Sequence, residues 1–132
     1  MTDTSAIKNY DEWYAFLCDL WDDDKQAEAL EIATREKDRF NDNPLLTAHF
    51  RACLYSLLHH DAQKVTEVLS EAMSETQWYI EEFWADSDFD AIRSAPEFQQ
   101  LQATSAARLA TAQESVRSEL LTVTPRESRA RP

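Results

Sequence analysis

Histidine, cysteine and carboxylate side chains are the residues of this chain that could do chemistry, and few of them have the spacing of a site. His59, His60 and Asp61 are consecutive, and His49 lies ten residues upstream of His59. Neighbouring residues on a helix point about 100° apart, so His59 and His60 cannot readily share one metal ion. A turn between two helices explains this His-His-Asp run better than a metal site does.

The two cysteines, Cys18 and Cys53, lie in apolar stretches with a helical pattern. Such a position is typical of small buried thiols, and we favour this interpretation over a disulfide or a metal pair. Asp22, Asp23 and Asp24 form a run of carboxylates, but this run lacks the glycine-containing pattern of a calcium loop. We therefore predict no metal site and no cofactor.

The absence of glycine from all 132 residues argues strongly against several classes of site. Phosphate loops, dinucleotide-binding turns and nucleophile elbows need glycine at fixed positions. Tight β-hairpins need residues at positive φ, which disfavours a β-rich fold. Hydrophobic residues make up 43% of the chain and aromatic residues 11%, which is enough for a packed core. Length and composition together predict one helical domain.

The net charge of −12 is unevenly spread along the chain. Residues 1–100 contain 22 acidic and 8 basic side chains, a net charge of −14, whereas residues 101–132 contain 3 acidic and 5 basic ones, a net charge of +2. An acidic body disfavours direct binding to nucleic-acid phosphates or anionic membranes. This charge either solvates the surface or is directed at a basic partner.

The N-terminus has no apolar signal core, and no run of the chain approaches the roughly 18 apolar residues of a membrane span. We therefore expect a cytoplasmic protein that does not insert into membranes.

Hydrophobic residues spaced three and four apart predict four helices in the first part of the chain. Their expected limits are about residues 10–21, 25–40, 44–59 and 62–75. An Asn or Asp precedes each one and can accept a hydrogen bond from the first turn. These expected caps are Asn9, Asp24, Asn43 and Asp61.

The stretch 78–101 is rich in aromatic residues, with two of the four tryptophans and three of the six phenylalanines. It predicts a short aromatic helix over about residues 77–84. Phe89 and Ile92 are expected on one further helical turn that closes the end of the core. Ser94 to Glu97 has the pattern of a capping box and is expected to begin a long last helix.

The expected domain spans residues 9–121, between a flexible N-terminal arm (1–8) and a disordered basic tail (122–132). The second half of the last helix has few large apolar residues: Leu109, Val116 and Leu120. Two arrangements are open for it. Either it packs lightly along the domain, or it pairs with a copy of itself along this stripe and forms a homodimer.

Two helix pairs of about 35 residues are typical of helix-turn-helix repeats. A shift of 35 residues places Cys18 on Cys53, and the segment 86–101 reads D-x-D-F-x-x-I-R-x-x-P-x-F-x-x-L. The first helix has a large, large, small, large pattern at Tyr14, Leu17, Cys18 and Trp21. On these residues, over about 10–101, the chain resembles the tetratricopeptide-repeat family. The resemblance implies an all-α array of two helical hairpins, a short aromatic helix and a long C-terminal helix.

Members of that family bind peptides or helices on a concave surface lined by the first helix of each pair. Carried onto this chain, the resemblance places five residues on that surface: Glu12, Asp19, Asp22, Arg51 and Tyr55. An acidic groove of this kind selects a basic or amphipathic segment. The implied function is a non-catalytic protein–protein interaction module, of the adaptor or chaperone-like kind.

Two other functions stay open. An acidic body is also typical of an inhibitor, an immunity protein or a nucleic-acid mimic that blocks a basic enzyme site. An enzyme is the third alternative, with Glu81, Glu82 and Asp86 as acid and base near Trp78 and Trp84. Because no nucleophile–base pair supports catalysis, we expect no enzymatic activity.

Overall fold

The computed structural model describes the backbone of residues 3–76 and 81–130 and the side chains of residues 3–74 and 81–120. All regular secondary structure in these ranges is helical, so the expected all-α fold is confirmed. The elements are α1 (Tyr10–Asp22), α2 (Gln26–Arg35), α3 (Pro44–His59), α4 (Ala62–Thr76), α5 (Glu81–Trp84), the 3₁₀ helix η1 (Ser87–Ile92) and α6 (Pro96–Ala130).

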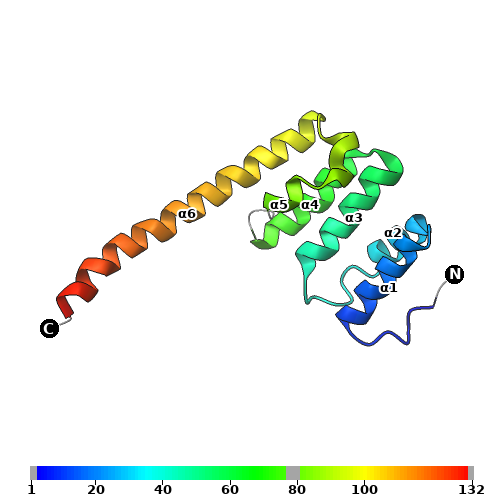
Figure 1. The fold of residues 1–132 in the computed structure, drawn as a ribbon, viewed down its shortest axis with the longest axis horizontal. Coiled ribbons are helices and arrows are strands. Elements are labelled where there is room, and N and C mark those ends of the chain that lie inside the picture. The colour runs from blue at the N-terminus through cyan, green and yellow to red at the C-terminus, as the bar shows by residue number, and fades with distance from the viewer. Residues whose placement is uncertain (1–2, 77–80, 131–132) are drawn as a thin grey trace.

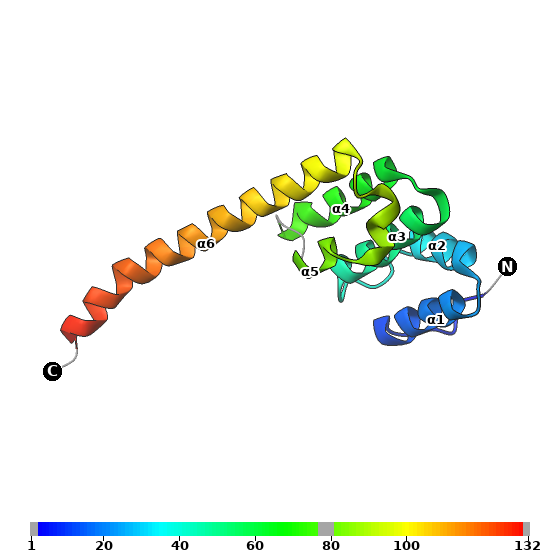
Figure 2. The ribbon, with the colours of Figure 1, turned by 45° about the horizontal axis from the view of Figure 1, so that its top comes forward.

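Successive helices of the body pack against one another (Figure 1). Helix α1 contacts α2, α2 contacts α3, and α3 contacts both α4 and η1. Helix α6 contacts α4 near its start and then extends away from the body (Figures 1 and 2). This order agrees with two consecutive helix pairs, while the assignment to a tetratricopeptide-repeat array stays a prediction.

Three helices begin at the caps that their sequence predicts. The side chain of Asn9 accepts a hydrogen bond from the Glu12 amide at 2.9 Å, and Asn43 accepts one from the Leu46 amide at 3.1 Å. Asp61 accepts a hydrogen bond from the Lys64 amide at 3.0 Å. These bonds satisfy amides that have no partner inside the helix. Local sequence therefore determines where α1, α3 and α4 begin.

The prediction for α2 is wrong at both ends. Asp24 does not cap the helix, because Lys25 occupies that position without a side-chain hydrogen bond. Asp24 instead has φ 61°, in the left-handed region that glycine usually supplies in a tight turn. The helix ends at Arg35 rather than Phe40. The carboxylate of the next residue, Glu36, accepts hydrogen bonds from Thr4 and Trp13, which lie far from it in the sequence.

The last helix begins one residue later than the predicted capping box requires. The amide of Gln99 donates to the carbonyl of Ala95, so Ala95 rather than Ser94 occupies the cap position. Pro96 is then the first helical residue. An N–H at that position has no partner inside the helix, so the proline loses no hydrogen bond there.

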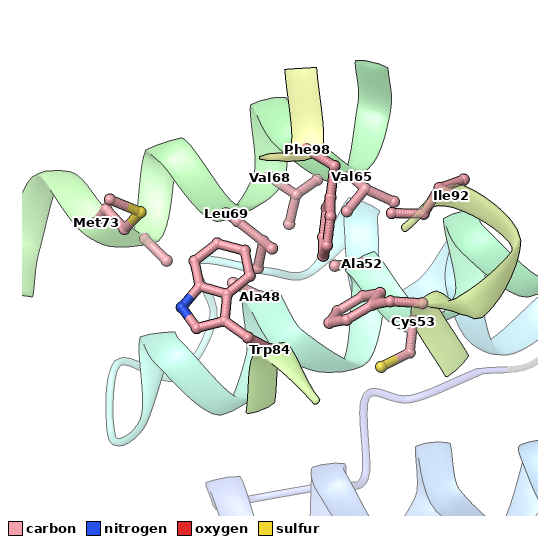
Figure 3. Packing of buried hydrophobic residues seen from close by; sticks show 12 residues of the cluster. Ala48, Ala52, Cys53, Val65, Val68, Leu69, Met73, Trp84, Ile92 and Phe98 are labelled. Atoms are coloured by element: carbon pink, nitrogen blue, oxygen red, sulfur yellow. The ribbon is translucent and has the colours of Figure 1, made fainter. Parts of the chain in front are cut away.

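The core of the described residues forms two clusters that meet along α3. One lies between α1, α2 and α3 and includes Trp13, Leu17, Ile32, Ala33 and Leu54. The other lies between α3, α4, α5, η1 and α6 (Figure 3) and includes Leu69, Met73, Trp84, Phe89, Ile92 and Phe98. Phe89 and Ile92 are 0% and 3% exposed, which confirms that this turn closes the core. Trp84 is also buried, and Trp78 lies outside the described residues.

Residues 3–8 are held against the body, where the sequence predicts a flexible arm. The hydroxyl of Thr4 is buried and donates to the Glu36 carboxylate at 2.6 Å. The guanidinium of Arg39 donates to the carbonyls of Thr4, at 3.0 Å, and Ile7. These bonds join positions more than thirty residues apart, so no local pattern reveals them.

Helix α6 leaves the core early. Ser105 is the last buried residue among its described side chains, whereas Val116 and Leu120 are 56% and 60% exposed. The helical backbone continues to Ala130, across most of the segment 122–132. Because the structure describes no side chain after residue 120, disorder of this tail stays a prediction. No helix in the described part of the chain is both long and apolar enough to cross a membrane.

Candidate functional site

A pocket of about 270 Å³ opens between α1, α3 and η1, and we call it the α1–α3 pocket. Its lining residues are Tyr14, Cys18, Trp21 and Asp22 of α1, His49, Phe50 and Cys53 of α3, and Asp86 and Asp88 at η1. Helices α1 and α3 are the first members of the two predicted pairs. The pocket therefore lies between the first helices of the two predicted pairs, beside η1.

Aromatic rings form one wall of the α1–α3 pocket. Phe50 is buried, and the rings of Tyr14 and Trp21 meet it edge-on at centroid distances of 5.6 and 5.3 Å. Tyr14 and Trp21 are seven residues apart, so they share one face of α1. Both are partly exposed, which leaves apolar ring surface available inside the pocket.

His49, Cys53 and Asp86 converge on the buried side of the pocket. Nε2 of His49 lies 2.9 Å from Oδ2 of Asp86 and 3.4 Å from Sγ of Cys53. The Cys53 thiol donates to the same Oδ2 at 3.8 Å. His49 and Cys53 are four residues apart and lie on one face of α3, where Cys53 marks the edge of the second core cluster (Figure 3).

The segment that carries Asp86 is fixed by backbone hydrogen bonds. Oδ1 of Asp86 accepts from the Asp88 amide at 2.9 Å, which leaves Oδ2 directed at His49. Arg93 donates to the carbonyls of Trp84 and Asp86, both at 2.7 Å. On α3, the imidazole of His49 is also held in position, because it stacks on the ring of Phe83 at a centroid distance of 4.0 Å.

Burial determines the charge of this cluster. It lowers the pKa of His49, against the opposing effect of Asp86, and it raises the pKa of the Cys53 thiol. Burial, with the neighbouring Asp86 carboxylate, also raises the pKa of Asp88. At neutral pH the imidazole and the thiol are therefore uncharged. Asp86 accepts a hydrogen bond from the thiol, and one from Nε2 of His49 in the tautomer that carries its proton there.

This geometry does not activate Cys53 as a nucleophile. A Cys-His-Asp relay places the thiol and the carboxylate on opposite nitrogens of the imidazole. Here both groups contact the same atom, Nε2 of His49. Reactive cysteines also have a lowered thiol pKa, whereas burial raises that of Cys53.

The described residues of the enzyme hypothesis differ in exposure, while Trp78 lies outside the described residues. Glu81 and Glu82 are exposed on α5, Trp84 is buried in the core, and only Asp86 lines the pocket.

Of the five partner-binding residues that the resemblance implies, only Asp22 lines the α1–α3 pocket. Glu12 and Asp19 are exposed on α1, and the Glu12 carboxylate accepts a hydrogen bond from the Lys8 amide at 3.3 Å. Tyr55 is half-buried on α3 and packs against both core clusters.

Arg51 faces a different part of the molecule. Its side chain is only 8% exposed, and Nε donates to the Thr34 hydroxyl at 3.3 Å. It lines a second pocket of about 400 Å³ together with Lys37 and Glu71, which form an ion pair at 2.6 Å. The structure thus separates Arg51 from Asp22, although the resemblance implies that they share one surface.

The cluster of His49, Cys53 and Asp86 was not predicted. The spacing of His49 and Cys53, four residues apart on one helix, is a signal that the sequence contains. Asp86 lies 33 residues beyond Cys53, and only the packing of η1 on α3 brings it there.

No protein-family model, curated protein or solved structure matches this chain. The resemblance to tetratricopeptide repeats therefore rests on the motif residues alone.

Proposed function

We propose that this protein is a non-catalytic interaction module, of the adaptor or chaperone-like kind, that binds a basic segment of a partner protein in the α1–α3 pocket. The observation that supports it is the pairing of three carboxylates, Asp22, Asp86 and Asp88, with the rings of Tyr14 and Trp21 in one pocket. Among the described residues, no Lys or Arg forms an ion pair with any of these three carboxylates.

The size of the pocket favours a single long side chain. Its volume of about 270 Å³ lies just below the roughly 300–1,000 Å³ of small-molecule sites. The stem of an Arg or Lys would pack along Tyr14 and Trp21, and its charged group would meet the carboxylates. A cation over an aromatic ring contributes about 0.5–2 kcal/mol, and Arg can also bind a carboxylate through two parallel hydrogen bonds. We therefore expect arginine to bind better than lysine.

The charge of the body acts at longer range. A net charge of −14 over residues 1–100 attracts basic segments before contact and raises the association rate. Salt screens this attraction over about 10 Å at 0.1 M. Binding would therefore weaken as salt rises, mainly through slower association.

The finer expectations from the sequence belong to the same proposal. They are a tetratricopeptide-like array, a cytoplasmic location and a homodimer along α6. The exposed apolar side chains of Val116 and Leu120, on the part of α6 that extends from the body, support the dimer (Figure 1).

Peptides of defined sequence test the pocket directly. Fluorescence anisotropy would compare a labelled arginine-rich peptide with the same peptide carrying citrulline, which removes the charge and keeps the shape. Asp22→Lys should weaken binding of the arginine peptide about 10-fold or more, because it places a cation inside the pocket.

Asp23→Lys is the matched control, since Asp23 is adjacent and exposed but does not line the pocket. It changes the net charge by the same amount and should reduce affinity only slightly. Equal losses for both variants would show that net charge alone matters and would contradict the pocket assignment. Equal losses together with tight, salt-sensitive binding to a nuclease would favour the acidic-inhibitor hypothesis instead.

A further inference from the structure

We propose that His49, Cys53 and Asp86 form a binding site for one zinc ion on the buried side of the α1–α3 pocket. The inference does not depend on the proposed function. It starts from the observation that one donor atom of each residue lies within 4.8 Å of the other two. The three residues come from α3 and from the segment before η1, which contact each other directly.

The separations of the donor atoms fit a tetrahedral ion. With zinc bonds of about 2.0–2.1 Å to nitrogen and oxygen and about 2.3 Å to sulfur, tetrahedral ligands lie roughly 3.3–3.6 Å apart. The observed separations are 2.9 Å for His49–Asp86, 3.4 Å for His49–Cys53 and 3.8 Å for Cys53–Asp86. An ion between the three atoms therefore requires shifts of only a few tenths of an ångström.

The chemistry of the donors selects zinc over the hard cations. Thiolate and imidazole are preferred ligands of zinc, whereas magnesium and calcium prefer sets composed of oxygen atoms. Three protein ligands leave a fourth position, and this position faces the pocket because His49, Cys53 and Asp86 all line it. A water molecule can complete the tetrahedron there.

The surrounding residues hold the ligands in place, as metal sites require. The His49 ring stacks on Phe83 at 4.0 Å and meets Phe89 edge-on at 5.6 Å. Asp86 uses Oδ1 to accept the Asp88 amide, so that Oδ2 remains for the ion. Binding would therefore demand little reordering of the chain.

The charge balance of binding is also favourable. As the Zn–S bond forms, the Cys53 thiol releases its proton to solvent, and the imidazole proton of His49 takes the Nδ1 position so that Nε2 can donate its lone pair. No electron is transferred. The thiolate, the Asp86 carboxylate and Zn²⁺ together are neutral, which lowers the cost of holding a divalent cation where Cys53 and His49 are 2% and 9% exposed.

Cobalt serves as a visible probe of this site. The full chain, reduced and freed of metal by a chelator, would be titrated with CoCl₂ under anaerobic conditions. We expect saturation at one ion per chain, with the d–d bands of tetrahedral Co²⁺ and a thiolate-to-cobalt charge-transfer band. Zinc should displace the cobalt and raise the melting temperature, whereas Mg²⁺ should do neither.

Variants assign the signal to the three residues. Cys53→Ser should abolish the charge-transfer band, and His49→Ala should weaken cobalt binding by roughly 100-fold or more. Cys53 and His49 are buried, so substitutions there can prevent folding. Asp86→Asn changes a partly exposed side chain without changing its shape, and it should weaken cobalt binding in a folded protein. Cys18→Ser and His59→Ala, a cysteine in the same pocket and a histidine at the exposed end of α3, should leave the spectrum unchanged.

The absence of tetrahedral bands in the folded full chain would overturn the proposal. So would a charge-transfer band that survives Cys53→Ser or disappears in Cys18→Ser. Asp86 belongs to both proposals. The peptide-binding test is therefore made on the metal-free chain with a chelator present, so that failure of either proposal can be told from failure of the other.

Discussion

His49 and Asp86 are 37 residues apart in the chain, yet Nε2 of His49 and Oδ2 of Asp86 lie at 2.9 Å. This contact joins α3 to the segment that begins η1, and both residues line the α1–α3 pocket. The side chains of His49 and Asp86 therefore belong both to the packing of η1 on α3 and to the candidate site.

The contact should be measurable in the stability of the protein without added metal. Asp86→Asn replaces a charged acceptor with an amide of the same shape, and we expect it to lower the free energy of unfolding by about 1–2 kcal/mol. Urea unfolding at neutral pH with a chelator present measures this change. Asp23→Asn, an exposed substitution, should change it by less than about 0.5 kcal/mol. A cost for Asp86→Asn as small as that of the control would show that the contact does not stabilise the fold.

Stability in acid should depend on Glu36. Burial acts to raise the pKa of this carboxyl, but hydrogen bonds from Thr4, Arg35, Arg39 and Trp13 outweigh it and lower the pKa from 4.5 to about 2. A lowered folded-state pKa stabilises the protein above the unfolded value, and the contribution is lost as pH falls from about 4.5 through 2. Acid therefore protonates Glu36 and releases the N-terminal segment.

Glu36→Gln should lower the free energy of unfolding by about 2 kcal/mol at neutral pH and flatten its decrease between pH 4.5 and 2. Urea unfolding over this pH range measures both effects. Glu31→Gln is the control, because that carboxylate is 64% exposed and pairs with Arg35 only at 3.7 Å. An unchanged pH profile in Glu36→Gln would contradict the assigned role.

The turn between α1 and α2 should tolerate glycine at one position and not at its neighbour. Asp24 has φ 61°, where a side chain costs about 1 kcal/mol, whereas Asp23 has φ −89°. Asp24→Gly should leave the melting temperature unchanged or raise it, because relief of this cost offsets the greater freedom of glycine in the unfolded chain. Asp23→Gly adds only that freedom and should lower the melting temperature. The opposite order would show that Asp24 is not strained.

The homodimer along α6 predicts a concentration-dependent mass. Light scattering on the full chain should approach twice the monomer mass as concentration rises, and removal of residues 113–132 should yield a monomer. The deletion begins after Ser105, the last buried side chain described in α6, so the body keeps its core. Leu120→Glu tests the same face without shortening the helix, and Glu119→Gln is its control. A full chain that stays monomeric at high concentration would contradict the dimer.

Much of the helical framework could be predicted because its signals are local. Asn9, Asn43 and Asp61 act on amides three residues away, and helix α3 has the limits that its proline and its hydrophobic spacing predict. Phe89 and Ile92 close the core as expected. The start and end of α2 could not be predicted in this way, because Asp24 adopts a backbone conformation and Glu36 makes contacts that the folded chain imposes.

The candidate site could be predicted only in part, because contacts between distant helices decide which of its side chains meet. Asp22 lines the pocket between α1 and α3, and its role in binding a partner stays a prediction. Arg51 is buried instead, because α3 packs on α2 and the Arg51 guanidinium donates to the Thr34 hydroxyl there.

By itself, the sequence determined the absence of glycine-dependent sites, the acidic charge of the body, and the positions at which most helices begin. These properties depend on composition and on interactions within one helical turn. The tertiary structure alone decided that Asp86 meets His49 and Cys53, that Glu36 holds the N-terminal segment, and that Arg51 is buried. Each of these depends on which faces of distant helices pack together, and that choice minimises the exposed apolar surface of the whole chain rather than of any one segment.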